Sequence, residues 1–139
     1  MKQSNFLKYT SIIMMLTAVV RLFFGFMMIN FFATAHTFGA ADPAMLRYAG
    51  AAILLIVLCA LAELVCGFQG AMNWAEPLLS GKCLKWGAAA LALGLAGNAF
   101  QWLSGYGVSY VAWLTGAVIP AVFTLAAWLF FRRSQSSAD

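Results

Sequence analysis

The most restrictive feature of this sequence is the wide spacing of its charged residues. No charged residue occurs between Trp86 and Phe131, and only Arg21 interrupts the apolar run from Tyr9 to Ala35. A transmembrane helix needs about 20 predominantly apolar residues to cross roughly 30 Å of hydrocarbon. Of the 139 residues, 64% are hydrophobic and 9% are charged, whereas a soluble domain carries roughly 25% charged residues. The sequence therefore predicts membrane-spanning helices.

Turn signals divide the apolar sequence into four predicted spans. These spans are approximately 9–33, 44–74, 85–102 and 108–131. Asp42-Pro43 precedes the second span as a helix N-cap and a first-turn proline. Glu76-Pro77 ends that span, and Ser104-Gly105-Tyr106-Gly107 separates the third from the fourth. The predicted fold class is all-α, a single four-transmembrane-helix bundle over 1–139 with a short polar tail at 134–139.

The orientation follows from lysine and arginine, which concentrate in cytoplasmic loops. An N-terminus in the cytoplasm leaves Arg47 alone on the outer side. The cytoplasmic ends then hold Lys2, Lys8, Lys82, Lys85, Arg132 and Arg133. Aromatic residues fall near both predicted boundaries: Trp74, Trp86 and Trp128 near the inner one, and Trp102, Tyr106, Tyr110 and Trp113 near the outer one. Both termini are therefore predicted to be cytoplasmic.

A secretory signal peptide is the competing interpretation of the first apolar run. Lys2 and Lys8 precede the run, and Ala33-Thr34-Ala35 has the small-residue pattern of a cleavage site. The run is longer than the usual apolar region of about 7–15 residues, and Arg21 lies in its middle. We therefore expect this segment to remain as the first span.

Polar residues of three predicted spans lie at one depth. Arg21, Glu63 and Asn98 are each about 13 residues, or roughly 20 Å of helix, from the nearest charge at the inner end. A lone charge at this depth costs about 3 to 17 kcal/mol. Arg21 and Glu63 have opposite charges, so we expect the first two helices to be neighbours joined by a guanidinium–carboxylate pair. We expect Asn98 to satisfy the hydrogen-bonding atoms that this pair leaves without a partner. Pro120 falls in the same layer of the fourth span and predicts a kink.

The pattern around this polar layer has two interpretations. Cys59, Glu63, Cys66 and Gly70 form one narrow stripe of the second span, and Gly87, Ala90, Gly94, Asn98, Gln101 and Gly105 form another on the third. Small residues allow helices to pack closely, and Asn and Gln form hydrogen bonds across helices. The stripes therefore predict either a packing seam with a structural ion pair, or a narrow pathway or pocket lined by Asn98, Gln101 and Glu63.

Other reactive residues point to no catalytic or metal-binding group. His36 is the only histidine, and with Asp42 it makes neither a metal site nor a triad. The cysteines Cys59, Cys66 and Cys83 lack the spacing of metal ligands, and no disulfide is expected. The net charge of +4 is spread singly over helix ends, which excludes the basic face of a nucleic-acid-binding protein. We expect a chain that is not an enzyme and has no cofactor and no metal.

Several short motifs resemble a group of small uncharacterised four-span proteins of clostridial bacteria. The resemblance lies in Gly67-Phe68-Gln69-Gly70, Glu76-Pro77, Lys82-Cys83 followed by Gly87, Leu7-Lys8-Tyr9, and Ile12-Ile13-Met14. It covers most of the chain and implies the fold and a multi-pass protein of the bacterial plasma membrane. It implies no activity.

A second resemblance is to DoxX-like membrane proteins. It rests on Arg21-Leu22 in the first span and on Glu63 with Gly67 in the second. DoxX proteins are four-span bundles linked to redox and thiol processes. This chain has Cys66-Gly67 where that group usually has paired glycines, so the resemblance implies the fold without a transferred function.

Two functions follow from these patterns. The first is a non-enzymatic membrane component, embedded in the lipid bilayer, that associates with itself or with another membrane protein and is held together by Arg21, Glu63 and Asn98. The second is a small oligomeric transporter or channel that uses Glu63 to bind a proton, a cation or a small molecule. A dry ion pair favours the first function, and a cavity that reaches Glu63 favours the second.

Overall fold

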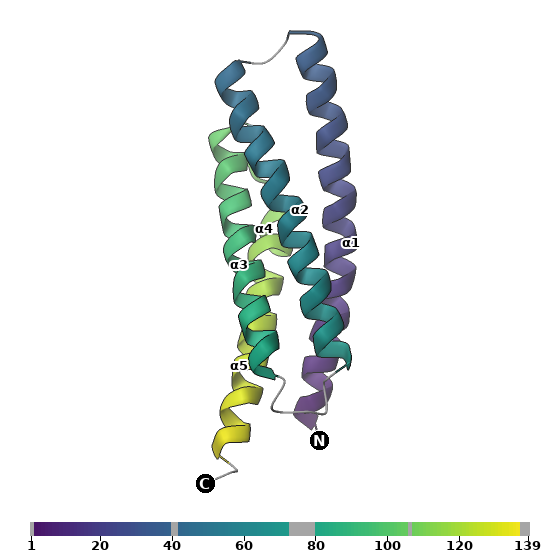
Figure 1. The fold of residues 1–139 in the computed structure, drawn as a ribbon, viewed down its shortest axis with the longest axis vertical. Coiled ribbons are helices and arrows are strands. Elements are labelled where there is room, and N and C mark those ends of the chain that lie inside the picture. The colour runs from purple at the N-terminus through teal and green to yellow at the C-terminus, as the bar shows by residue number, and fades with distance from the viewer. Residues whose placement is uncertain (1, 40–41, 73–79, 106, 137–139) are drawn as a thin grey trace.

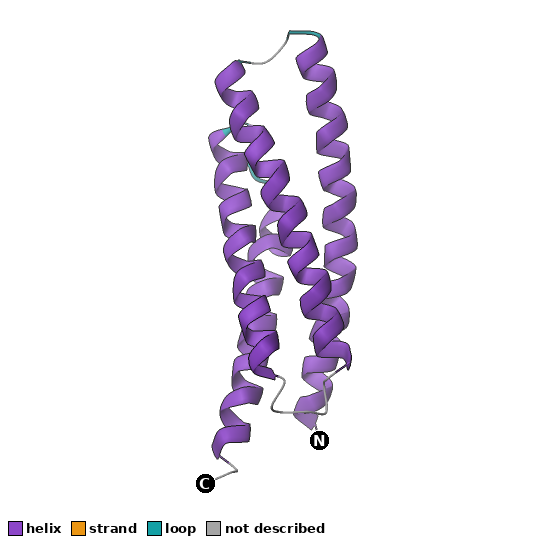
Figure 2. Cartoon of the chain, viewed as in Figure 1, coloured by secondary structure: helices purple, strands orange, loops and turns teal. Residues whose placement is uncertain are grey.

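The computed structural model describes residues 2–39, 42–72, 80–105 and 107–136. Its elements are α1 (Lys2–Thr37), α2 (Pro43–Met72), α3 (Ser80–Leu103), α4 (Tyr110–Trp113), the π-helical turn η2 (Leu114–Val118) and α5 (Ile119–Ser136). No strand occurs in these ranges, and Figure 2 shows the described residues as helices and a few loop residues. The predictions made for Trp74, Glu76-Pro77 and Tyr106 fall outside the described residues.

Within the described residues, four helical rods are long and apolar enough to cross a membrane. They cover Asn5–Thr37, Pro43–Met72, Gly81–Leu103 and Tyr110–Arg133. The all-α four-helix bundle predicted from the sequence is therefore confirmed, and the chain is a multi-pass membrane protein. Helices α1 and α5 extend beyond the predicted spans, so the beginning of the predicted polar tail, up to Ser136, is helical.

The rods pack as an antiparallel bundle in which α1 contacts α2, α2 contacts α3, and α5 contacts both α3 and α1. The start of α1 and the end of α5 lie at the same end of the bundle (Figure 1). We call this the terminal end. The opposite end carries the α1–α2 and α3–α4 connections, and we call it the loop end.

Local sequence signals mark the start of α2 and the connection between α3 and α4. Asp42 caps α2, because its Oδ1 accepts a hydrogen bond of 3.0 Å from the Ala44 amide, directly before Pro43. Between α3 and α4, Gly105 and Gly107 have φ values of 80° and 66°, which glycine adopts without steric cost. Ser109 then caps α4 by accepting a hydrogen bond from the Ala112 amide.

The apolar core lies in the half of the bundle near the terminal end. Its cluster of buried residues consists of Leu7, Met14, Ala62, Cys66, Cys83, Ala90, Phe123 and Ala127. These residues come from all four rods, and among the described residues Phe123 is the largest fully buried side chain. Dense packing therefore closes the bundle on this side of the polar layer.

The π-helical turn lies directly before Pro120, where the sequence predicts a kink. Proline has no amide hydrogen, so the carbonyl of Gly116 loses its usual donor four residues later. The Ile119 amide bonds to Leu114 O, five residues back. The Gly116 carbonyl packs against α3 at Gly94, where a Cβ would overlap its oxygen. Glycine at position 94 thus allows a close approach of α3 to the fourth rod.

Candidate functional site

The structure brings Arg21 of α1 and Glu63 of α2 together in the interior. Arg21 Nη1 lies 3.7 Å from Glu63 Oε1, and their side chains are 5% and 0% exposed. This distance exceeds the 2.7–2.9 Å that is typical of a charge-assisted hydrogen bond. The two residues therefore form an ion pair between neighbouring helices, without the direct guanidinium–carboxylate fork.

Cys59 bridges this pair. Its sulfur accepts a hydrogen bond from Arg21 Nη1 and lies 3.5 Å from Glu63 Oε1. The thiol has one hydrogen, which it donates either to Glu63 or to the Ala90 carbonyl at 3.2 Å. The sequence pattern places Cys59 in a stripe with Glu63 but does not predict its bond to the ion pair. The signal for its role was its position one turn before Glu63 on the same stripe of α2.

Thr115 gives Arg21 a second anchor on the fourth rod. Arg21 Nε donates to Thr115 Oγ1 at 3.2 Å, and that hydroxyl donates to the Val111 carbonyl at 2.8 Å. One guanidinium therefore joins α1, α2 and η2. Thr115 was not among the predicted site residues, although its hydroxyl beside Gly116, in the middle of the fourth span, was a usable signal.

Asn98 lies in the same layer but has a different partner from the one expected. Its Nδ2 donates to the carbonyl of Ala112 in α4 at 3.3 Å. Among the described residues, neither Asn98 Oδ1 nor Glu63 Oε2 has a hydrogen-bond partner. Because a carbonyl can only accept, the bond to Ala112 also identifies which end of the Asn98 amide is nitrogen.

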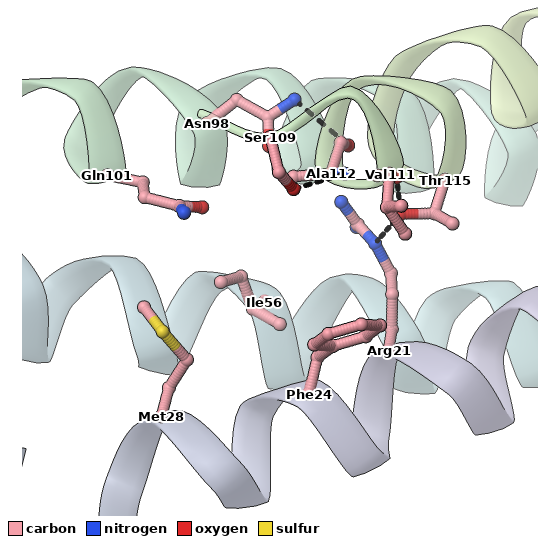
Figure 3. A pocket seen from close by; sticks show the side chains of 10 residues that line it. All are labelled: Arg21, Phe24, Met28, Ile56, Asn98, Gln101, Ser109, Val111, Ala112 and Thr115. Carbon is pink, nitrogen blue, oxygen red and sulfur yellow. Dashed lines mark hydrogen bonds between the residues drawn. The ribbon is translucent and has the colours of Figure 1, made fainter. Parts of the chain in front are cut away.

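A cavity of about 70 Å³ lies on the loop-end side of Arg21, between α1, α2, α3 and α4. It is lined by Arg21, Phe24, Met28, Ile56, Asn98, Gln101, Ser109, Val111, Ala112 and Thr115. Figure 3 shows the guanidinium reaching from α1 towards Asn98 and Ala112, with Gln101 further along α3. This volume holds several water-sized groups, since one water needs about 10–15 Å³ of such space.

The cavity separates the predicted site residues into two sets. Arg21, Asn98 and Gln101 line it. Glu63 is fully buried and is not among the lining residues. Gly87, Ala90 and Gly94 of the α3 stripe are buried on the other side of Asn98. The packing seam and the pocket predicted from this stripe therefore occupy different depths of one helix.

Comparison with known protein families, with curated proteins and with solved structures found no match. The resemblances to clostridial four-span proteins and to DoxX-like proteins stay expectations. The proposed function therefore rests on the geometry of the site.

We predict that Thr115→Val destabilises the protein by about 1–3 kcal/mol, because the substitution removes the hydroxyl that accepts from a buried guanidinium while keeping the side-chain shape. Unfolding by sodium dodecyl sulfate titration in mixed micelles measures the change. Thr34→Val is the control, since Thr34 is exposed and its hydroxyl bonds only to Asn30 O of its own helix. An equal loss in both variants would contradict a special role for Thr115.

Proposed function

We propose that this chain is a non-enzymatic membrane protein that binds a small molecule in the cavity beside Arg21. The Arg21–Glu63 pair and Asn98 hold the bundle in register, and the cavity-facing side of Arg21 and Asn98 receives the ligand. The observation that carries the proposal is a buried guanidinium lining a cavity. Intramembrane cations usually mark substrate or ligand sites.

Binding of a small molecule accounts for the cavity better than transport of a molecule through the bundle does. The apolar core packs tightly between this site and the terminal end, so the cavity is closed on that side. A transporter that uses Glu63 needs a path to its carboxylate, and the lining of the cavity stops at Arg21. In the transporter alternative, a second copy of the chain would have to complete the path.

The orientation of the protein belongs to the same proposal. Lys8, Lys82, Lys85, Arg132 and Arg133 are carried by the terminal end and Arg47 by the loop end. The excess of positive charge puts the terminal end in the cytoplasm. The cavity then lies in the outer half of a plasma membrane, bacterial by the clostridial resemblance, where a ligand reaches it from outside or from the bilayer.

We predict that filling the cavity expels the ligand. Met28 lines the cavity, whereas its neighbour Met27 is half-exposed on the outer face of α1. Wild type, Met28→Trp and Met27→Trp are purified from the native membrane, and their solvent extracts are compared by mass spectrometry. We expect wild type and Met27→Trp to carry the same small molecule at similar occupancy, and Met28→Trp to lose it.

Two results would overturn the binding proposal. One is retention of the molecule by Met28→Trp at the occupancy of Met27→Trp, which would place it outside the cavity. The other is a wild-type extract with no molecule enriched over that of an unrelated four-helix membrane protein purified in the same way.

A further inference from the structure

A groove on the membrane-facing surface meets the cavity at Asn98. The groove has a volume of about 420 Å³ and is lined by Leu95, Asn98, Ala99, Trp102, Val108 and Trp113. Leu95, Trp102 and Trp113 are 44%, 68% and 49% exposed. Its walls are therefore apolar and aromatic and face acyl chains in the bilayer.

Asn98 is the boundary between the two spaces. It lines both the cavity and the groove, and its bond to the Ala112 carbonyl crosses from α3 to α4. Among the described residues, this is the side-chain hydrogen bond that joins these two helices. Asn98 is therefore the side chain that lies between the groove at the bilayer and the cavity at Arg21.

An unpartnered oxygen beside a guanidinium at this boundary favours a hydroxyl head group. Asn98 is 2% exposed, and its Oδ1 has no donor among the described residues. Arg21 lines the cavity, and its Nε and Nη1 are engaged by Thr115, Cys59 and Glu63. Its Nη2 lies at Gly116, where a Cβ would overlap it. A ligand hydroxyl that donates to Oδ1 gives this atom its missing partner, and the same oxygen is able to accept from the Arg21 guanidinium.

The charge balance favours a neutral head group. The cation of Arg21 already has its counter-ion in Glu63. An anionic ligand would add a second negative charge to a site with one positive charge, in a medium where unpaired charge is costly.

We propose that a neutral, hydroxyl-headed lipid, such as a long-chain alcohol, enters sideways between α3 and α4 and sets its hydroxyl between Arg21 and Asn98. This inference rests on the proposed binding function and adds the ligand class and the entry route. The alkyl chain lies in the groove beside Trp102 and Trp113, and the head group bonds to Asn98 Oδ1, the atom that the Asn98–Ala112 bond does not use.

The test uses hexadecanol that carries a diazirine in its chain, with the whole protein in lipid nanodiscs. We expect photo-crosslinks on peptides of α3 and α4 that line the groove. Unlabelled hexadecanol should compete, and hexadecane, which lacks the head group, should not. Asn98→Ala should weaken this competition about fivefold, the loss expected for one neutral hydrogen bond.

A blocked groove tests the route. Ala99→Trp fills the groove, whereas Ala92→Trp puts the same side chain on an exposed position of α3 outside it. We expect Ala99→Trp to abolish the crosslink and Ala92→Trp to retain it. Equal labelling of both variants would overturn sideways entry.

Other results distinguish the inference from the binding function beneath it. If the molecule found in native extracts is lost from Met28→Trp but kept by Ala99→Trp, the cavity binds a ligand that does not enter from the bilayer, and only the inference fails. Stronger competition by palmitate than by hexadecanol would overturn the neutral head group. If Met28→Trp loses nothing, the binding function itself fails.

Discussion

Replacing Arg21 by Met should destabilise the protein by about 3–5 kcal/mol, and replacing Glu63 by Met should cost a similar amount. Each single substitution removes one charge of a pair that is almost completely buried and leaves the other without its counter-ion. The double variant Arg21→Met with Glu63→Met leaves no lone charge, and we expect its stability to return to within about 1 kcal/mol of wild type. The free energies of unfolding come from titration in mixed micelles.

The double-mutant cycle is the decisive part of this experiment. A coupling energy of at least about 3 kcal/mol is expected if the two charges act as one pair. Lys85→Met is the control, because Lys85 is an exposed cation on α3 and its removal should change stability by less than about 0.5 kcal/mol. A double variant as unstable as the sum of the singles would show that Arg21 and Glu63 stabilise the bundle independently.

The second large effect is expected at Gly94. A methyl group at this position would overlap the Gly116 carbonyl oxygen, and a backbone atom cannot rotate away as a side chain does. We expect Gly94→Ala to destabilise the protein by about 2–3 kcal/mol, in the range measured for overpacked cores. The same variant should disturb the cavity, because Gly116 also contacts the Arg21 guanidinium.

Gly97→Ala is the matched control on the same helix. A Cβ there meets Leu55 and Ile56 at 3.5 Å or more, which is ordinary contact. We expect its stability to equal that of wild type or to rise by up to about 1 kcal/mol, from the helix propensity of Ala. Equal destabilisation of the two variants would indicate a general sensitivity of α3 rather than a close approach at Gly94.

The sequence was enough to predict the bundle because hydropathy and bilayer thickness constrain the spans directly. It was also enough to bring Arg21 and Glu63 together, since a short connection makes α1 and α2 neighbours and two opposite charges avoid lipid most cheaply as a pair. Both predictions depend on residue type and position along the chain, which are readable without coordinates.

The details of the site depend on helix rotation and on backbone groups, which residue types do not specify. Cys59 bridges the ion pair because α1 and α2 face each other at one particular rotation. Asn98 bonds to the Ala112 carbonyl, a main-chain atom that any residue would supply. The division between the dry side at Glu63 and the cavity at Gln101 arises from side-chain packing on four helices at once.

The π-helical turn at Leu114–Val118 determines which side of α4 faces the interior of the bundle. A turn of this kind holds one residue more than an α-helical turn, and one residue corresponds to about 100° of rotation around the helix axis. A continuous α-helix from Ser109 to Ser136 would therefore swing Ser109 and Val111 about a quarter-turn away from Arg21. The additional residue turns the segment before Pro120 towards the cavity, while α5 keeps its own Phe123 in the apolar core.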